Sequence, residues 1–130
     1  MSNIKFADFE KLDIRIGTVI KAEVPEWSHW VMKLSVDFGL EIGERIIFAG
    51  IMKFYKAEDL ENKQFPFVIN IEPKKIGPEG DFSQGMILAA DFIKETTPLR
   101  QGFEGDNKPE DGKPVLFYLT EKVPNGTKVR

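Results

Sequence analysis

The chain has 130 residues, of which 42% are apolar and 30% charged, a balance typical of one globular domain and not of a disordered or membrane-spanning chain. Cysteine is absent and histidine occurs once, which excludes disulfides, thiolate catalysis and clusters of these residues around a metal, so we expect neither a metal nor a cofactor. The net charge of −3 argues against a surface coated with positive potential, although it leaves room for a local basic patch.

The N-terminal half of the chain predicts three strands. Residues 12–24 alternate until Gly17, where the phase changes, so we expect a bulge or sharp bend at that glycine. Residues 31–39 alternate without interruption, which predicts a half-exposed second strand, and residues 44–51 supply a third. The residues of the second strand that we expect to face the core are Met32, Leu34, Val36 and Phe38.

The second half adds a short helix and further strands. Residues 53–63 are a helix candidate, and residues 65–71 predict a fourth strand whose core face carries alternate apolar residues, with Asn70 on the opposite face. Residues 85–93 predict a fifth strand and residues 114–121 a late additional one. The expected core residues of the fourth strand are Phe65, Phe67, Ile69 and Ile71.

This order of elements predicts an all-β fold in a single domain over residues 1–130. Five strands with one short helix between the third and fourth match a five-stranded Greek-key barrel, the OB-fold, here with an extended C-terminal segment. A generic antiparallel sandwich is the alternative. The polar, turn-rich segment 102–114 is either a solvated loop or a cover over part of the barrel.

No catalytic signature is present, so we expect a binding module and not an enzyme. The sequence "SHW" around His29 is no triad motif, and "GPEGDFSQG" lacks the spacing of a nucleotide-binding glycine loop. The N-terminus "MSNIKFADFEKLD" lacks the layout of a signal peptide and no window is apolar enough to span a membrane. We therefore expect a cytoplasmic protein that does not associate with membranes.

Residues 74–90, "KKIGPEGDFSQGMILAA", form the most promising binding surface. Lys74 and Lys75 precede a loop whose glycines let backbone amides approach a phosphate. The amide of Asn70 can bond sugar or base edges, and Lys33 on the polar face of the second strand can extend the patch. A turn with solvated lysines is the other interpretation, and these residues alone do not decide between the two.

Five separated blocks of the sequence resemble a known family. The blocks "FEKLDIRIGTVIKAE", "KLSVDFG", "FYKAEDLENK", "NIEPKKIGPEGDFSQGMILAA" and "KVPNGTKV" are similar, in order and spacing, to the tRNA-binding domain at the C-terminus of bacterial methionyl-tRNA synthetases. The same domain occurs as a free-standing dimeric tRNA-binding protein. The resemblance covers the chain from Phe9 to its last residues.

The resemblance implies an OB-fold that binds tRNA mainly by shape and backbone contacts, usually as a homodimer. An aminoacyl-tRNA synthetase is the other partner that it implies. A related branch consists of export chaperones that bind unfolded polypeptide, which is the alternative function. The RNA-binding residues that it implies are Lys33, Asn70, Lys74, Lys75, Ser83, Gln84, Gly85 and Met86.

This chain departs from the family pattern on the expected RNA face. The stretch "VPEWSHWVMKL" replaces a usual histidine-proline and aspartate-lysine arrangement, and Ala49 stands where serine is common. Trp27 and Trp30 in that stretch are candidates for stacking an unpaired base. Burial at a barrel end or dimer interface is the other interpretation of the two tryptophans.

Overall fold

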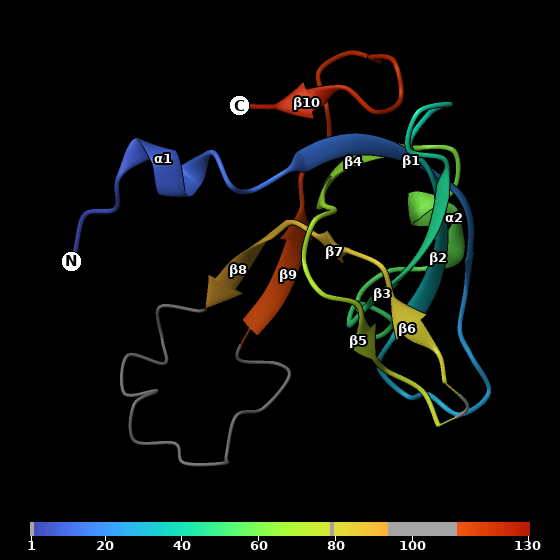
Figure 1. Cartoon of the computed structure of the whole chain (residues 1–130). Helices are drawn as coiled ribbons and strands as arrows, with labels where there is room; N and C mark the ends of the chain where they lie inside the picture. Colours follow the sequence, from blue (N-terminus) through green and yellow to red (C-terminus); the bar gives the residue numbers. More distant parts are fainter. Residues whose placement is uncertain (1, 79, 94–111) are drawn as a thin grey trace.

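The structure, a computed structural model, describes residues 2–78, 80–93 and 112–130. Its main sheet is antiparallel, follows the order β3-β2-β1-β4-β7, and curls into a nearly closed barrel (Figure 1). The all-β fold, the strand order of an OB-fold and the short helix between the third and fourth strands are therefore confirmed. The barrel elements are β1 (Ile14–Glu23), β2 (Met32–Asp37), β3 (Glu44–Ala49), α2 (Ala57–Leu60), β4 (Gln64–Val68) and β7 (Met86–Ile87).

The strong curvature of β1 has two separate causes. The pairing of β1 with β2 shifts register between Val19 and Lys21, so the bulge lies at Ile20 and its predicted position at Gly17 was wrong. Gly17 is needed for a close approach instead. A Cβ there would lie 2.6 Å from Val36 Cγ1 and 2.7 Å from the ring of Phe38, so only glycine lets β1 pass over the core.

The core takes buried residues from every strand of the barrel and from α2, and the inward faces of β2 and β4 supply much of it. The predicted alternation in β2 is confirmed, and the rings of Phe38 and Phe67 meet edge to face with centroids 5.4 Å apart. The alternation predicted for β4 is only partly right. Val68 is buried as well, the strand ends there, and Ile71 is exposed because the chain bends at residues 70–71.

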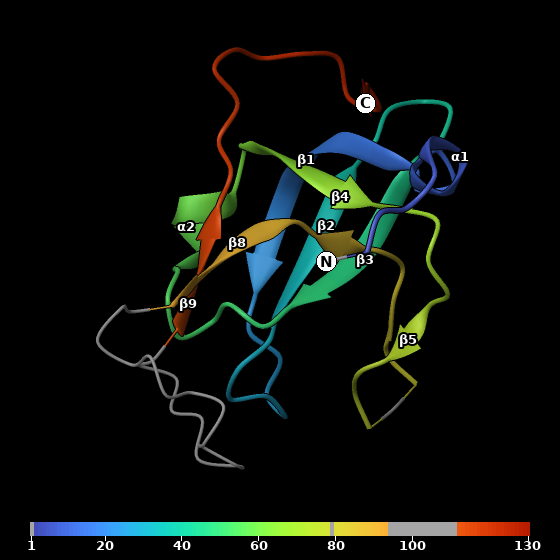
Figure 2. The ribbon, with the colours of Figure 1, turned by 90° about the vertical axis from the view of Figure 1, so that its left-hand side faces the viewer.

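The predicted fifth strand divides into two strands with different partners. β7 pairs with β4, and Leu88 N–H then donates to the carbonyl of Pro66. From there β8 (Ala89–Ile93) leaves the barrel and pairs with β9 (Gly112–Leu116), as Figure 2 shows. The late strand predicted at residues 114–121 is therefore β9, which starts and ends earlier. Most of the segment 102–114, residues 102–111, lies outside the described residues.

The extended C-terminal segment returns to the barrel, where β10 (Lys128–Val129) pairs with β1. The side chain of Asn125 joins three strands. Its Oδ1 accepts hydrogen bonds from Thr18 Oγ1 at 2.6 Å and Gln64 Nε2 at 2.9 Å, and its Nδ2 donates to Asp37 at 3.3 Å. These bonds hold the C-terminal segment across one end of the barrel.

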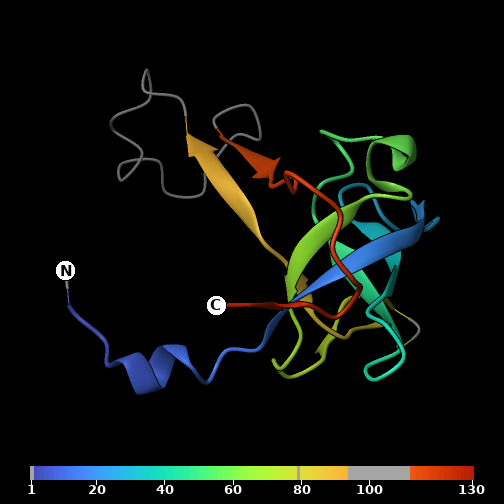
Figure 3. The ribbon, with the colours of Figure 1, turned by 90° about the horizontal axis from the view of Figure 1, so that it is seen from above.

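Residues 2–13, here called the N-terminal arm, precede the barrel and project away from it (Figure 3). The arm contains α1 (Phe6–Phe9), which the sequence analysis missed because one helical turn is too short to show a periodicity. Within the described residues, no helix has the length and apolar character needed to cross a membrane.

Candidate nucleic-acid interface

The lysine-containing loop folds as a hairpin beside the barrel. β5 (Lys74–Lys75) pairs with β6 (Phe82–Ser83), with Lys74 opposite Ser83 and Lys75 opposite Phe82. The backbone of Ile76 donates to the carbonyl of Asp81 at 2.7 Å, which closes the hairpin above its tip. Residues 74–83 are called the hairpin below, and Figure 1 shows them next to β3.

The last residue of the hairpin and the two residues after it close the barrel against the free edge of β3. Ser83 Oγ accepts a hydrogen bond from Phe48 N–H and donates one to the carbonyl of Gly85, both at 2.9 Å. Gln84 Oε1 accepts from Ile46 N–H at 2.8 Å, and Gln84 N–H donates to the Ile46 carbonyl at 2.8 Å. Two side chains thus take acceptor positions that a neighbouring strand would normally supply.

Gly85 and Arg45 complete this closure. A Cβ on Gly85 would lie 2.9 Å from the carbonyl oxygen of Val68 on β4 and 3.0 Å from Ile47 Cδ1 on β3. Any larger residue would therefore push against both strands. Arg45 Nη1 donates to the carbonyls of Ile69 at 2.6 Å and Gln84 at 3.3 Å. The sequence analysis missed Arg45, because the carbonyls that it binds are distant in the sequence.

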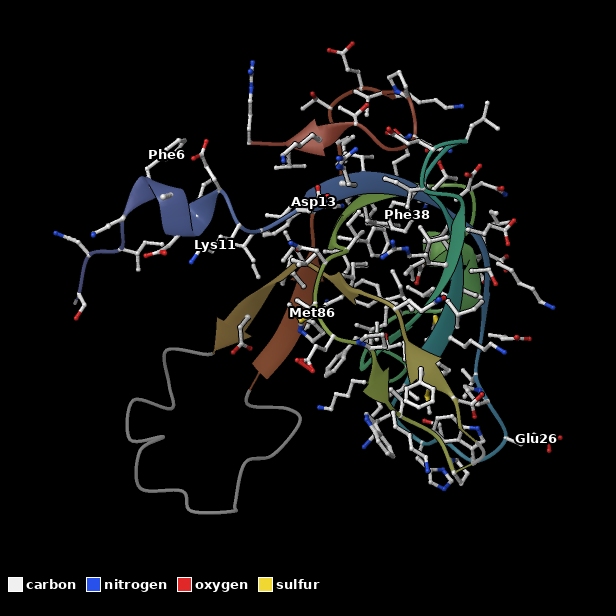
Figure 4. The ribbon with its side chains drawn as sticks, in the orientation of Figure 1. Phe6, Lys11, Asp13, Glu26, Phe38 and Met86 are labelled. Atoms are coloured by element: carbon white, nitrogen blue, oxygen red, sulfur yellow. The ribbon has the colours of Figure 1, made fainter. Side chains whose placement is uncertain are left out.

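Asn70 has a structural role at the base of the N-terminal arm. Its Nδ2 donates to the carbonyl of Lys11 at 2.6 Å, and its Oδ1 accepts from Asp13 N–H at 2.8 Å. Figure 4 shows Lys11 and Asp13 where the arm meets β1. The amide predicted to bond RNA therefore already holds the arm, and its contact with RNA stays a prediction.

A groove of about 400 Å³ separates the hairpin from the outward face of β2 and β3. Lys33 lies on this face, and in the strand register it stands between Glu23 on β1 and Phe48 on β3. We call the space between the hairpin and the outward face of β2 and β3 the hairpin groove. Its lining residues are Lys33, Ile46, Phe48, Pro73, Gly80, Asp81, Phe82 and Gln84.

Charged residues of both signs surround the hairpin groove, with Lys33 and Asp81 in its lining. Lys74 and Lys75 are exposed on the hairpin. A smaller hollow of about 240 Å³ shares Lys33 with the groove and is lined on its other side by Glu23 and Glu26 of the β1–β2 loop. Figure 4 shows Glu26 projecting away from the barrel. Because Asp81 of the hairpin lines the groove together with Lys33, an anion is favoured beside Lys33 and the exposed hairpin lysines and is repelled near Asp81.

The structure brings only part of the predicted set of RNA-binding residues together. Lys33 and Gln84 line the hairpin groove, and the two hairpin lysines lie beside it. Ser83, only 6% exposed, and Gly85 are buried in the barrel closure. Met86 lies half-exposed on β7 and does not line the groove. The roles of these residues in RNA binding stay predictions.

The two tryptophans lie in different environments. Trp27 packs on Phe48, with ring centroids 6.0 Å apart, and a Cβ on Gly77 would lie 2.6 Å from its ring, so Trp27 supports the tip of the hairpin. Trp30 is 54% exposed and lines a separate pocket of about 460 Å³. The other residues of that pocket are Gly50, Lys53, Phe54, Ala89, Ala90, Asp91, Gly112, Lys113 and Pro114.

Phe82 was not singled out from the sequence, although its ring is 49% exposed and lines the hairpin groove. The available signal was an aromatic residue inside a glycine-rich loop, where packing against a core is not expected. No group of three or more His, Cys, Asp or Glu side chains in the described part of the chain is arranged to hold a metal ion.

Comparisons with known proteins place this geometry in a family context. A family model described as "Putative tRNA binding domain" matches residues 14–128. A methionine–tRNA ligase of Pyrococcus horikoshii is 44% identical over 131 residues, which cover 100% of this chain and 15% of that ligase. A methionine–tRNA ligase of Bacillus anthracis is 33% identical, and the match covers 98% of this chain and 16% of the ligase. The chain thus spans about a sixth of the length of these relatives.

Solved structures agree with the OB-fold. The MetRS-related protein from Pyrococcus horikoshii superposes with a TM-score of 0.78 at 35% identity, covering 100% of both chains. The chaperone CsaA from Bacillus anthracis superposes with a TM-score of 0.75 at 33% identity, covering 99% of this chain and 100% of that one. A MetRS-related protein and a chaperone therefore both occur among the similar structures.

Replacing Ser83 by alanine should destabilise the barrel by about 1–3 kcal/mol, because the buried Phe48 N–H then loses its acceptor. The free energy of unfolding in urea measures this loss. The matched control is Ser35→Ala, which removes the same hydroxyl from the outward face of β2. Equal stability of the two variants would contradict the closing role of Ser83.

Proposed function

Because the chain belongs to the tRNA-binding domain family, we propose that it binds tRNA at the hairpin groove and catalyses no reaction. The observation that carries the proposal is the position of Lys33 in the lining of the groove, with Lys74 and Lys75 exposed on the hairpin that forms one wall of it. Amine side chains at this spacing suit the phosphates of an RNA backbone, and the closed barrel keeps their positions fixed.

The affinity of such a surface is modest and depends on salt. Only a few lysines face the groove, so few phosphates are neutralised and few counterions are released. The net charge of −3 keeps binding to other nucleic acids weak. A module of this kind assists an aminoacyl-tRNA synthetase by raising the local concentration of tRNA. Residence in the cytoplasm, where tRNA is used, stays a prediction.

We further propose that the chain acts as a homodimer joined through its N-terminal arm. The arm projects from the barrel (Figure 3), and the side chain of Phe6 on it is 70% exposed, with its ring near that of Phe9. Ile4 and Leu12 add to the exposed apolar surface of the arm. A second copy of the chain would remove this surface from water and give the dimer two sets of hairpin lysines.

Binding of unfolded polypeptide is the second candidate function. It is favoured by the similarity to the solved structure named chaperone CsaA and by the pocket beside Trp30, whose lining includes Phe54, Ala89 and Pro114. An apolar pocket of this kind suits a hydrophobic side chain of a peptide. The two functions use different surfaces, so substitutions in the hairpin separate them.

The double substitution Lys74→Ala/Lys75→Ala should weaken tRNA binding at low salt and flatten its salt dependence. Each phosphate contact that is lost reduces the slope of log K against log salt by about 0.7 to 0.9. Binding isotherms at several salt concentrations measure both effects. The matched control, Lys63→Ala/Lys122→Ala, changes the net charge equally but at another pocket, next to Tyr118. Absence of tRNA binding by the unmodified chain at low salt, or equal losses in both variants, would refute the proposed surface.

Light scattering on the protein as it elutes from a size-exclusion column should give a molar mass twice the chain mass of 14.8 kDa. Phe6→Glu/Phe9→Glu should give a monomer, because two charges would be buried unpaired in the interface. Leu40→Glu, at a fully exposed position of the β2–β3 turn, is the control and should remain dimeric. A monomeric unmodified chain would rule out this assembly.

A further inference from the structure

Phe82 is an aromatic residue whose side chain is about half-exposed to solvent. Its ring belongs to β6, directly before the buried Ser83, and 49% of it is exposed. Because neighbouring residues of a strand point to opposite faces, burial of Ser83 in the barrel closure directs Phe82 outward. The exposed ring contributes to the wall of the hairpin groove opposite Lys33 and Phe48.

The groove beside this ring has the size and chemistry of a site for one flat polar molecule. Its volume of about 400 Å³ is at the lower end of the range of small-ligand pockets, about 300 to 1,000 Å³. Phe82 supplies a flat apolar face. Gln84 uses its Oε1 for Ile46 N–H, so a bond from Gln84 to a ligand uses the amino group, which donates.

The charges around the groove fix the orientation of the ligand. Lys75 pairs with Phe82 across the hairpin, so the two side chains emerge on the same face. A base stacked on Phe82 therefore has its phosphate next to Lys75. Asp81 in the groove lining, and Glu23 and Glu26 in the adjoining hollow that shares Lys33 and Asp81 with the groove, repel phosphate from that end.

We propose that Phe82 is a stacking platform for one unpaired base of the RNA, with the phosphate of that nucleotide on Lys75. The inference rests on the proposed function and adds the class of ligand to it. A base inside a duplex has no free face, so the hairpin groove takes a nucleotide from a loop or a single-stranded end. Trp27 is not the platform, because it packs beneath the hairpin tip against Phe48.

The experiment measures the affinity of Phe82→Leu for tRNA over a series of salt concentrations. Loss of one base stack should reduce the affinity by about 5- to 150-fold. The slope of log K against log salt should not change, because no phosphate contact is removed. Phe82→Tyr, which retains a flat ring, should bind as the unmodified chain does. The matched control is Phe117→Leu, since that ring is 45% exposed but does not line the groove.

The outcomes separate this inference from the proposed function. Unchanged tRNA affinity of Phe82→Leu, together with weakened binding by Lys74→Ala/Lys75→Ala, would overturn the stacking platform and leave tRNA binding intact. A flattened salt dependence in Phe82→Leu would also overturn it, since the ring would then act by positioning the lysines. Loss of binding to unfolded polypeptide but not to tRNA would assign the ring to a peptide. An unmodified chain that binds no tRNA would overturn both proposals.

Discussion

The hydrogen bonds from residues 83 and 84 to the edge of β3 are the constraint on which the rest of the structure depends. An open sheet edge exposes backbone donors that must find partners, and here Phe48 and Ile46 find them in a serine hydroxyl and a glutamine amide. Arg45 adds two bonds to carbonyls on the other side of the closure. The barrel is thus closed by residues 83–85, through side-chain bonds as well as the backbone of Gln84, and not by a long strand.

This mode of closure also creates the candidate functional surface. Because Ser83 at the end of the hairpin and Gln84 after it are bound to β3, the hairpin must stand beside the outward face of β2 and β3. The hairpin groove is the space left between these elements. Its lysines and the ring of Phe82 come from parts of the chain that the closure brings together. Stability and binding therefore depend on the same short motif, although through different atoms.

The sequence predicted what local periodicity determines. Alternation at Met32, Leu34 and Val36 located β2 correctly, and the order of strands around one short helix indicated the OB-fold. The sequence analysis missed the bulge at Ile20 because it assigned the bend to Gly17. That glycine instead allows a close contact between β1 and the core. Periodicity carries no information about which distant backbone group a side chain will bond.

That limit explains why the roles predicted for several residues of the candidate site differ from the positions that the structure gives them. Ser83 bonds a residue 35 positions away, and Asn70 bonds Lys11 of the N-terminal arm 59 positions away, so their roles in the fold were invisible in the sequence. Trp27 and Trp30 are three residues apart in the sequence, yet the loop between β1 and β2 directs them to separate pockets. The position of Lys33 on the outward face of β2 could be inferred from alternation, whereas the roles of Lys33, Lys74 and Lys75 in RNA binding stay predictions.

The central claim is that a closed barrel holds an RNA-binding groove between β3 and the hairpin. Amide hydrogen exchange with and without tRNA tests it most directly. The account predicts that the amides of Ile46 and Phe48 exchange as slowly in the free protein as those of central β1, and that tRNA adds protection at residues 74–84 but not at residues 113–118. Fast exchange at Ile46 and Phe48, or tRNA-induced protection confined to residues 113–118, would contradict it.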